Sequence, residues 1–270
     1  MHPPRRTESA VGRLGVSSSD TQQHLAEVFG VLATLARETG ISPERGELVR
    51  ADRRSEFDYF GLRTPDRRRR VAAGFSFTGQ DSASVLAAWD EIWNLAENGD
   101  VMFTALDFYR RRISSRSWTP HDSAEFWGTA VGWIERIDNW AHADDLARLY
   151  SFALADQPEL VFPTLEEWSR SDNEWQRRIA MVSLIHYSGK NAVFLPIEPT
   201  LRLLANCAGD RRETVSNALG WVLRELLAVH PDAVLAFLET HATSMPRPAI
   251  RRATERLPQP ERDRMRASLA

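Results

Sequence analysis

Three tryptophans each lie three or four residues before a charged side chain. They are Trp140 with Asp144, Trp175 with Arg178, and Trp221 with Arg224. In an α-helix these spacings put both members of a pair on one face. Aromatic rings, one carboxylate and two guanidiniums can then converge on a ligand that is flat or cationic in one part and anionic elsewhere. DNA that carries a positively charged damaged base fits this description.

Trp221 lies off the apolar stripe of its expected helix, residues 211–229. At about 100° per residue, Val215, Leu219 and Leu226 share one sector, whereas Trp221 projects almost opposite to it. One interpretation is an aromatic side chain that serves function. The other is a second packing interface, because helices in stacked repeats pack on two sides.

The helix expected over residues 140–154 begins with Trp140, and Trp140 and Asp144 lie at the edge of its apolar sector. Both can reach whatever lies beside the core. The ordinary alternative is a helix start, where the helix dipole favours a carboxylate. His142, between them in sequence, is expected at the surface.

The arginines have two interpretations each. Arg178 projects toward a groove, where its fork suits a phosphate, or it pairs with a carboxylate such as Asp172 or Glu174. The arginine run at residues 67–70 is either a solvated helix face or a contact to the DNA backbone. Spacing alone leaves these alternatives open.

Composition limits the class of protein. The 270 residues carry a net charge of −3, and all but one of the 34 basic residues are arginine. Arginine forks suit phosphates, but a GC-rich gene gives the same bias. No apolar run approaches the roughly 20 residues of a membrane span. The single cysteine, Cys207, excludes an internal disulfide and a multi-cysteine metal site.

The elements that must position these side chains are helices. Strand signals are nearly absent, and amphipathic stretches of roughly 8 to 18 residues recur from about residue 22 to residue 257. The sequence therefore predicts an all-α protein, an α-solenoid of HEAT-like helical repeats with a concave groove. A compact helical bundle is the alternative.

We expect a disordered tail at residues 1–20, the solenoid at 21–258 and a C-terminal tail at 259–270. The N-terminal segment has no apolar core of a secretory signal, so a cytoplasmic protein is expected. No HExxH, GxSxG, Walker or GxGxxG pattern occurs in the sequence. No metal or organic cofactor is therefore expected.

Five segments, in order, resemble the DNA alkylation repair family of AlkD-like glycosylases built on HEAT-like repeats. They are residues 57–65 followed by Arg67 and Arg68, 137–140 continuing to Asp144, 171–175 followed by Arg177, Arg178 and Ala180, 218–225 followed by His230 and Pro231, and 245–247, which end at Arg247. The resemblance covers residues 57–257.

This resemblance implies a monomeric, monofunctional glycosylase that removes N3- or N7-alkylated purines from duplex DNA. Trp140 and Trp221 would line the deoxyribose of the lesion, and Asp144 would be the catalytic carboxylate. Arg178 and Arg224 would hold flanking phosphates. Further DNA contacts are expected from Trp175, Arg67, Arg68 and Arg247.

Two positions depart from the family pattern. Ala141 replaces a frequent acid, and Asn217 replaces a common lysine, which weakens the expected phosphate contact. The alternatives are a catalytically silent binder of damaged or branched DNA and a HEAT-type scaffold that binds a protein. A groove without net positive charge would favour the scaffold.

Overall fold

The computed structural model describes residues 18–115, 117–185 and 196–268. These residues form helices and no strand, which confirms the predicted all-α solenoid. The elements are α1 (Ser18–Glu38), α2 (Pro43–Arg53), α3 (Thr64–Ala72), α4 (Ser82–Leu95), α5 (Gly99–Ile113), α6 (Pro120–Ala130), the 3₁₀ helix η1 (Val131–Arg136), α7 (Trp140–Asp156), α8 (Pro158–Trp168), α9 (Glu174–Val182), α10 (Ile197–Ala205), α11 (Glu213–Leu227), α12 (Pro231–His241), α13 (Arg247–Ala253) and α14 (Gln259–Ser268).

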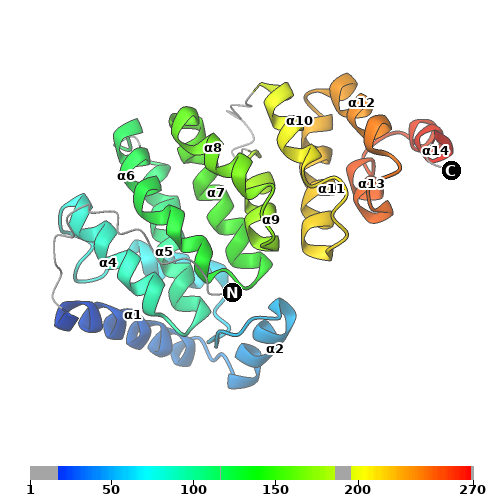
Figure 1. Cartoon of the computed structure of the whole chain (residues 1–270). Coiled ribbons are helices and arrows are strands. Elements are labelled where there is room, and N and C mark those ends of the chain that lie inside the picture. Colours follow the sequence, from blue (N-terminus) through cyan, green and yellow to red (C-terminus); the bar gives the residue numbers. More distant parts are fainter. Residues whose placement is uncertain (1–17, 116, 186–195, 269–270) are drawn as a thin grey trace, which may run out of the picture.

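From α4 to α14 the helices follow one another along an elongated row, and α2 lies beneath the middle of that row (Figure 1). Helix α7 packs against α5, α6, α8 and α9, and α11 packs against α9, α12 and α13. Each helix thus covers the apolar face of its neighbours, as in a stack of helical pairs. Among the described residues, no helix is long and apolar enough to cross a membrane.

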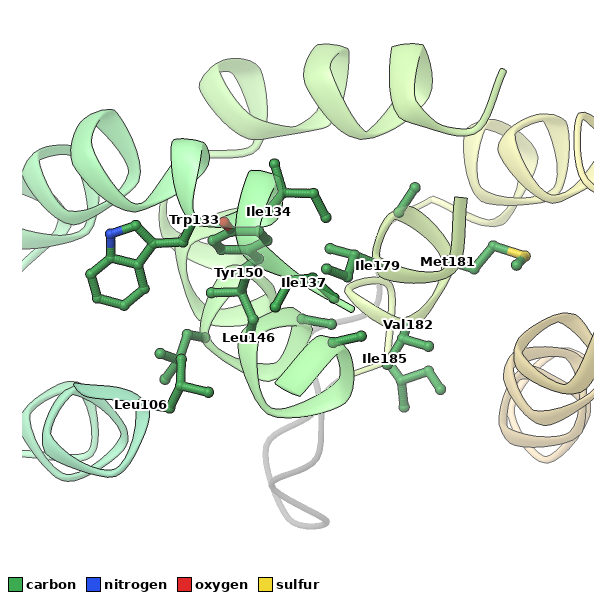
Figure 2. Close-up of a cluster of buried hydrophobic side chains, with 14 of the residues drawn as sticks. Leu106, Trp133, Ile134, Ile137, Leu146, Tyr150, Ile179, Met181, Val182 and Ile185 are labelled. Carbon is green, nitrogen blue, oxygen red and sulfur yellow. The ribbon is translucent and has the colours of Figure 1, made fainter. Parts of the chain in front are cut away.

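A continuous apolar core runs through the row. Figure 2 shows its middle part, where side chains of α5, η1, α7 and α9 meet. Leu146 and Tyr150 of α7 are fully buried there, as are Trp133 of η1 and Ile179 of α9. This packing fixes α7 against α9, and these two helices carry Asp144 and Arg178.

Asparagine caps determine where two of the tryptophans stand. The Asn139 side chain accepts hydrogen bonds from the N–H groups of Ala141 and His142, and the Asn173 side chain accepts them from Trp175 and Gln176. Such caps satisfy N–H groups that have no partner within the helix. Trp140 therefore opens α7, and Trp175 is the second residue of α9.

Two expectations concern the chain ends. The expected N-terminal tail lies outside the described residues up to residue 17, and α1 begins at Ser18. The segment expected as a C-terminal tail contains helix α14, Gln259–Ser268.

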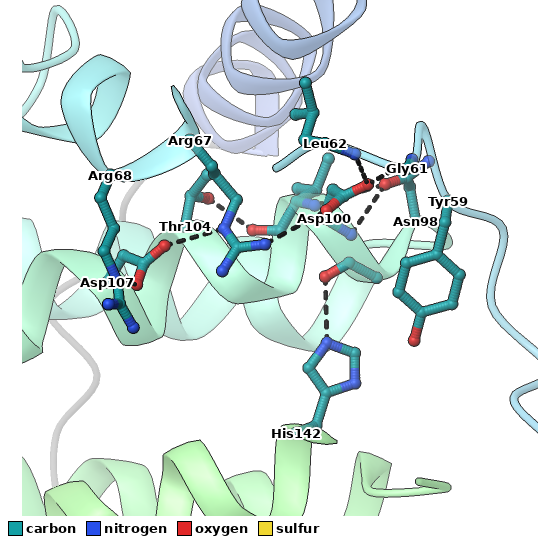
Figure 3. Close-up of polar contacts among 12 residues, drawn as sticks. Tyr59, Gly61, Leu62, Arg67, Arg68, Asn98, Asp100, Thr104, Asp107 and His142 are labelled. Carbon is teal, nitrogen blue, oxygen red and sulfur yellow. Dashed lines mark hydrogen bonds and ion pairs between the residues drawn. The ribbon is translucent and has the colours of Figure 1, made fainter. Parts of the chain in front are cut away.

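Arg67 is buried, which corrects the expectation that it contacts DNA. Its side chain is 2% exposed and bonds to Asp107 at 2.8 Å and to Asp100 at 3.3 Å (Figure 3). Arg68 shares the Asp107 carboxylate, at 2.8 Å. Two guanidiniums of α3 thus pair with two carboxylates of α5, so part of the arginine run holds these two helices together.

His142 is also buried, contrary to the expected surface position. Its Nε2 lies 3.0 Å from the carbonyl oxygen of Gly99 (Figure 3). Its Nδ1 lies 2.7 Å from the Asn139 side chain. Burial lowers the pKa of His142 to about 3, so the ring is neutral. It connects the start of α7 to the start of α5.

Candidate functional site

An open groove of about 930 Å³ lies where α2, α7, α9, α11 and α13 face one another. Four of these helices belong to the row, and the fifth, α2, lies beneath it (Figure 1). The lining residues are Asp52, Arg53, Arg54, Glu56, Ile137, Asp138, Trp140, Asp144, Glu174, Trp175, Arg178, Glu213, Thr214, Asn217, Trp221, Arg224 and Arg252.

The structure brings together all three tryptophans singled out from the sequence. Trp140 is 47% exposed, and Trp175 and Trp221 are half-buried. They come from α7, α9 and α11, whose first turns all contribute to the groove. Trp221 lines the groove and also packs on the core, so its position agrees with both of its interpretations.

Asp144 and Arg178 form the central ion pair. Arg178 Nε and Nη2 donate to the two carboxylate oxygens of Asp144 at 2.8 and 2.9 Å, and Nη1 donates to the Thr214 carbonyl at 2.8 Å. The two side chains are only 9% and 20% exposed. One guanidinium therefore ties α7, α9 and α11 together at the groove floor.

This pairing revises the expected role of Arg178. The partner is Asp144 from another helix, not the nearby Asp172 or Glu174, and the guanidinium does not stand open to a phosphate. Burial raises the pKa of Asp144 above its ordinary value, and the Arg178 charge opposes that rise. Arg178 thus favours the ionised carboxylate and fixes its orientation.

Arg224 lines the groove from α11 with its guanidinium already paired. It donates to Glu225 at 2.7 Å and also pairs with Glu255. Its side chain is 14% exposed. A phosphate that binds Arg224 must therefore share it with these carboxylates.

Arg68 and Arg247 do not line the groove. Arg68 is 37% exposed and pairs with Asp107, and Arg247 is exposed at the start of α13. Arg67 is buried, as described above. Of the nine residues predicted for the site, the structure thus brings six to one groove: Trp140, Asp144, Trp175, Arg178, Trp221 and Arg224.

Sequence reasoning missed three groove arginines: Arg53, Arg54 and Arg252. The first two end α2, and the third lies on α13 with its Nε buried and without a hydrogen-bond partner. Asn217, where the family pattern favours lysine, also lines the groove. The sequence did not single out Arg53 and Arg54 as site residues, because the last turn of α2 lies outside the segments that resemble the family.

The lining is mixed in charge. Six carboxylates and five guanidiniums give it a formal charge of −1. Within the described residues, no group of three His, Cys, Asp or Glu side chains is placed to hold a metal ion. The groove can thus bind a cationic group through its carboxylates and aromatic rings. It can bind an anionic group through arginines that exchange their carboxylate partners.

The model of the family described as DNA alkylation repair enzyme matches residues 35–257. A predicted DNA alkylation repair enzyme from Enterococcus faecalis has a similar structure, with a TM-score of 0.64 and 15% identity over 81% of this chain and 97% of that one. AlkD2 from Streptococcus mutans gives a TM-score of 0.49 and 16% identity over 77% of this chain and 89% of its own. No curated protein sequence matches the chain.

Proposed function

Because the chain belongs to the DNA alkylation repair enzyme family, we propose that it is a monofunctional DNA glycosylase. It hydrolyses the N-glycosidic bond of N3- or N7-alkylated purines in duplex DNA. The observation that carries the proposal is the Asp144 carboxyl, held by Arg178 at the floor of a groove lined by Trp140, Trp175 and Trp221.

The chemistry needs few groups. Alkylation at N3 or N7 leaves the purine cationic and a good leaving group, so the bond breaks with its electron pair moving to the base. The sugar then acquires oxocarbenium character. Asp144 stabilises that positive charge and orients the water whose oxygen bonds to the sugar carbon, and the water proton passes to solvent. The tryptophan faces favour the same cationic sugar.

Arg178 acts as a positioning residue in this scheme. Its two bonds to Asp144 hold both carboxylate oxygens, and its bond to Thr214 fixes the guanidinium to α11. Burial raises the pKa of Asp144, and the nearby Arg178 charge opposes that rise and so favours the ionised form. The pair is therefore part of the catalytic arrangement and is not available as a simple phosphate clamp.

The DNA backbone is held by arginines around the groove. Arg224 reaches a flanking phosphate by exchanging one of its carboxylate partners, and the exposed Arg247 and partly exposed Arg68 contact the backbone farther from the lesion. Since the groove is open, the base need not enter a deep pocket, unlike in base-flipping enzymes. Bulky adducts then fit as well.

One observation favours a second candidate. A formal charge of −1 in the groove suits a protein partner with basic residues better than a polyanion. A HEAT-type scaffold is therefore the alternative, beside a silent binder of damaged or branched DNA.

The test is an incubation of the full-length protein with a duplex that contains one N7-methylguanine. The proposal expects free N7-methylguanine and an alkali-labile site at that position. Binding without base release would replace the proposal with the silent binder, and absence of DNA binding would replace it with the scaffold.

A further inference from the structure

Helix α2 ends on a residue in an unusual conformation. Arg54 has φ 53° and ψ 41°, and among the described non-glycine residues it is the one with positive φ. The Arg54 N–H bonds to the Ala51 carbonyl and the Ser55 N–H bonds to the Arg50 carbonyl, both at 3.1 Å. This is the Schellman ending of a helix, in which glycine usually takes the left-handed position. The β-carbon of arginine is crowded in that conformation.

The residues after Arg54 are anchored at the catalytic end of α7. The Ser55 hydroxyl donates to the Asp138 carboxylate at 2.9 Å, and the Glu56 N–H donates to it at 2.6 Å. Asp138 directly precedes the Asn139 cap, and Trp140 opens the helix. The position of Arg54 is thus fixed relative to the tryptophan at the groove.

The Arg54 side chain extends over the groove. It is 84% exposed, and its Nη1 lies 3.7 Å from a carboxylate oxygen of Glu213, which is 74% exposed at the start of α11. Both residues line the groove, from α2 and α11. An ion pair this exposed contributes little to stability, so its partners exchange readily.

We propose that Arg54 contacts a backbone phosphate of DNA bound in the groove, and that the phosphate replaces Glu213 as its partner. A phosphate accepts two parallel bonds from a guanidinium and carries its charge close to that fork. Glycine at position 54 would adopt the left-handed conformation without strain, yet the residue is arginine. Strained residues of this kind are found mainly at functional sites. This inference rests on the proposed DNA-binding function.

The key variant is Arg54→Gly. Glycine removes the guanidinium and relieves the backbone, so the midpoint of urea unfolding rises while DNA binding weakens. Binding is measured with a fluorescent duplex that carries a stable abasic analogue, across a salt series. Log affinity falls with log salt concentration, and loss of one phosphate contact makes this slope less steep by about 0.9. Arg37→Gln, an exposed arginine at the end of α1, is the control and leaves the slope unchanged.

Glu213→Gln tests the exchange itself. Removing the competing carboxylate raises affinity in the wild-type background, and this gain disappears in the Arg54→Gly background. A gain of equal size in both backgrounds contradicts the exchange, because Glu213 then acts by direct repulsion.

The two proposals fail separately. If the wild type does not bind the duplex, the proposed DNA function fails. If the wild type binds and Arg54→Gly binds equally well with the same salt slope, only the role of Arg54 is overturned.

Discussion

Arg178 holds both oxygens of Asp144 at 2.8 and 2.9 Å, in a setting where burial raises the pKa of that carboxyl. Without the Arg178 cation, the ionised form of the buried Asp144 carboxyl is less favourable. In the proposed reaction, the pair therefore affects the pH range in which Asp144 carries the charge that stabilises the sugar. This effect is separable from any contact with DNA.

In Arg178→Gln, we expect the pKa of Asp144 to rise further. The acid limb of the single-turnover rate against pH then moves to higher pH, because the carboxylate protonates earlier as pH falls. The measurement is release of N7-methylguanine with enzyme in excess below neutral pH, where this base in DNA is cationic. Arg178→Lys keeps the charge and serves as the control.

A phosphate clamp predicts a different result. If Arg178 only bound the DNA backbone, Arg178→Gln would weaken affinity and leave the acid limb in place. Coincident acid limbs for the wild type and the variant would contradict the positioning role.

For single residues, the sequence predicted the groove tryptophans and Asp144, because helical spacing puts each tryptophan on the same face of its helix as a charged residue. It did not predict the Asp144–Arg178 bond, since that contact depends on how α7 packs against α9. It also misplaced Arg67, because an arginine run on a helix looks the same whether it faces solvent or two buried carboxylates. The conformation of Arg54 could not be predicted, because arginine as a residue type gives no indication of a left-handed φ.

At the scale of elements, the groove depends on how closely α11 and α13 approach. A β-carbon on Gly220 of α11 would lie 2.6 Å from the Ala249 carbonyl oxygen and 2.9 Å from the Arg252 β-carbon. The backbone of α13 cannot yield as a flexible side chain does. Glycine at this position thus allows α13 to bring Arg252 to the groove.

Gly220→Ala should therefore destabilise the fold by about 1–3 kcal/mol through overpacking. The measurement is urea unfolding followed by circular dichroism. Gly128→Ala in α6 is the matched control, because its β-carbon meets no atom within 4 Å. That control should gain about 0.5–1 kcal/mol from helix propensity. Equal stability of Gly220→Ala and the wild type would contradict the close approach.

The helix pattern was accessible from sequence because its signals are local. Recurrent apolar periodicity from about residue 22 to residue 257 predicted the helices. The buried His142 was not accessible, because a single polar residue near an apolar face gives no indication of its partner. Its bond to the Gly99 carbonyl depends on the meeting of α5 and α7.

For the whole molecule, the buried His142 makes stability depend on pH. Its folded-state pKa of about 3 lies below the ordinary histidine value of 6.5, which applies to the unfolded chain. A lowered histidine pKa gives a contribution that is complete above about pH 6.5. That contribution is lost as pH falls toward 3, since the unfolded state then takes up a proton that the folded state does not.

We expect the free energy of unfolding to fall by roughly 1 kcal/mol per pH unit below pH 6.5 from this residue. Urea titrations at pH 7 and pH 5 measure it. His142→Asn should show a smaller dependence on pH than the wild type, whatever its absolute stability. The same slope in His142→Asn and the wild type would rule out His142 as the source.

The fold brings α2, α7, α9, α11 and α13 around the groove, and the proposed activity depends on a single charge within it. Asp144→Asn keeps the side-chain shape and removes the charge, and Asp172→Asn, at an exposed position that precedes the Asn173 cap of α9, is its control. Single-turnover release of N7-methylguanine, measured beside duplex affinity, is the most direct test. The account predicts a loss of at least about a hundredfold in rate for Asp144→Asn, as for removal of one transition-state charge contact, with affinity changed little. A wild-type rate in Asp144→Asn, with duplex binding intact, would contradict it.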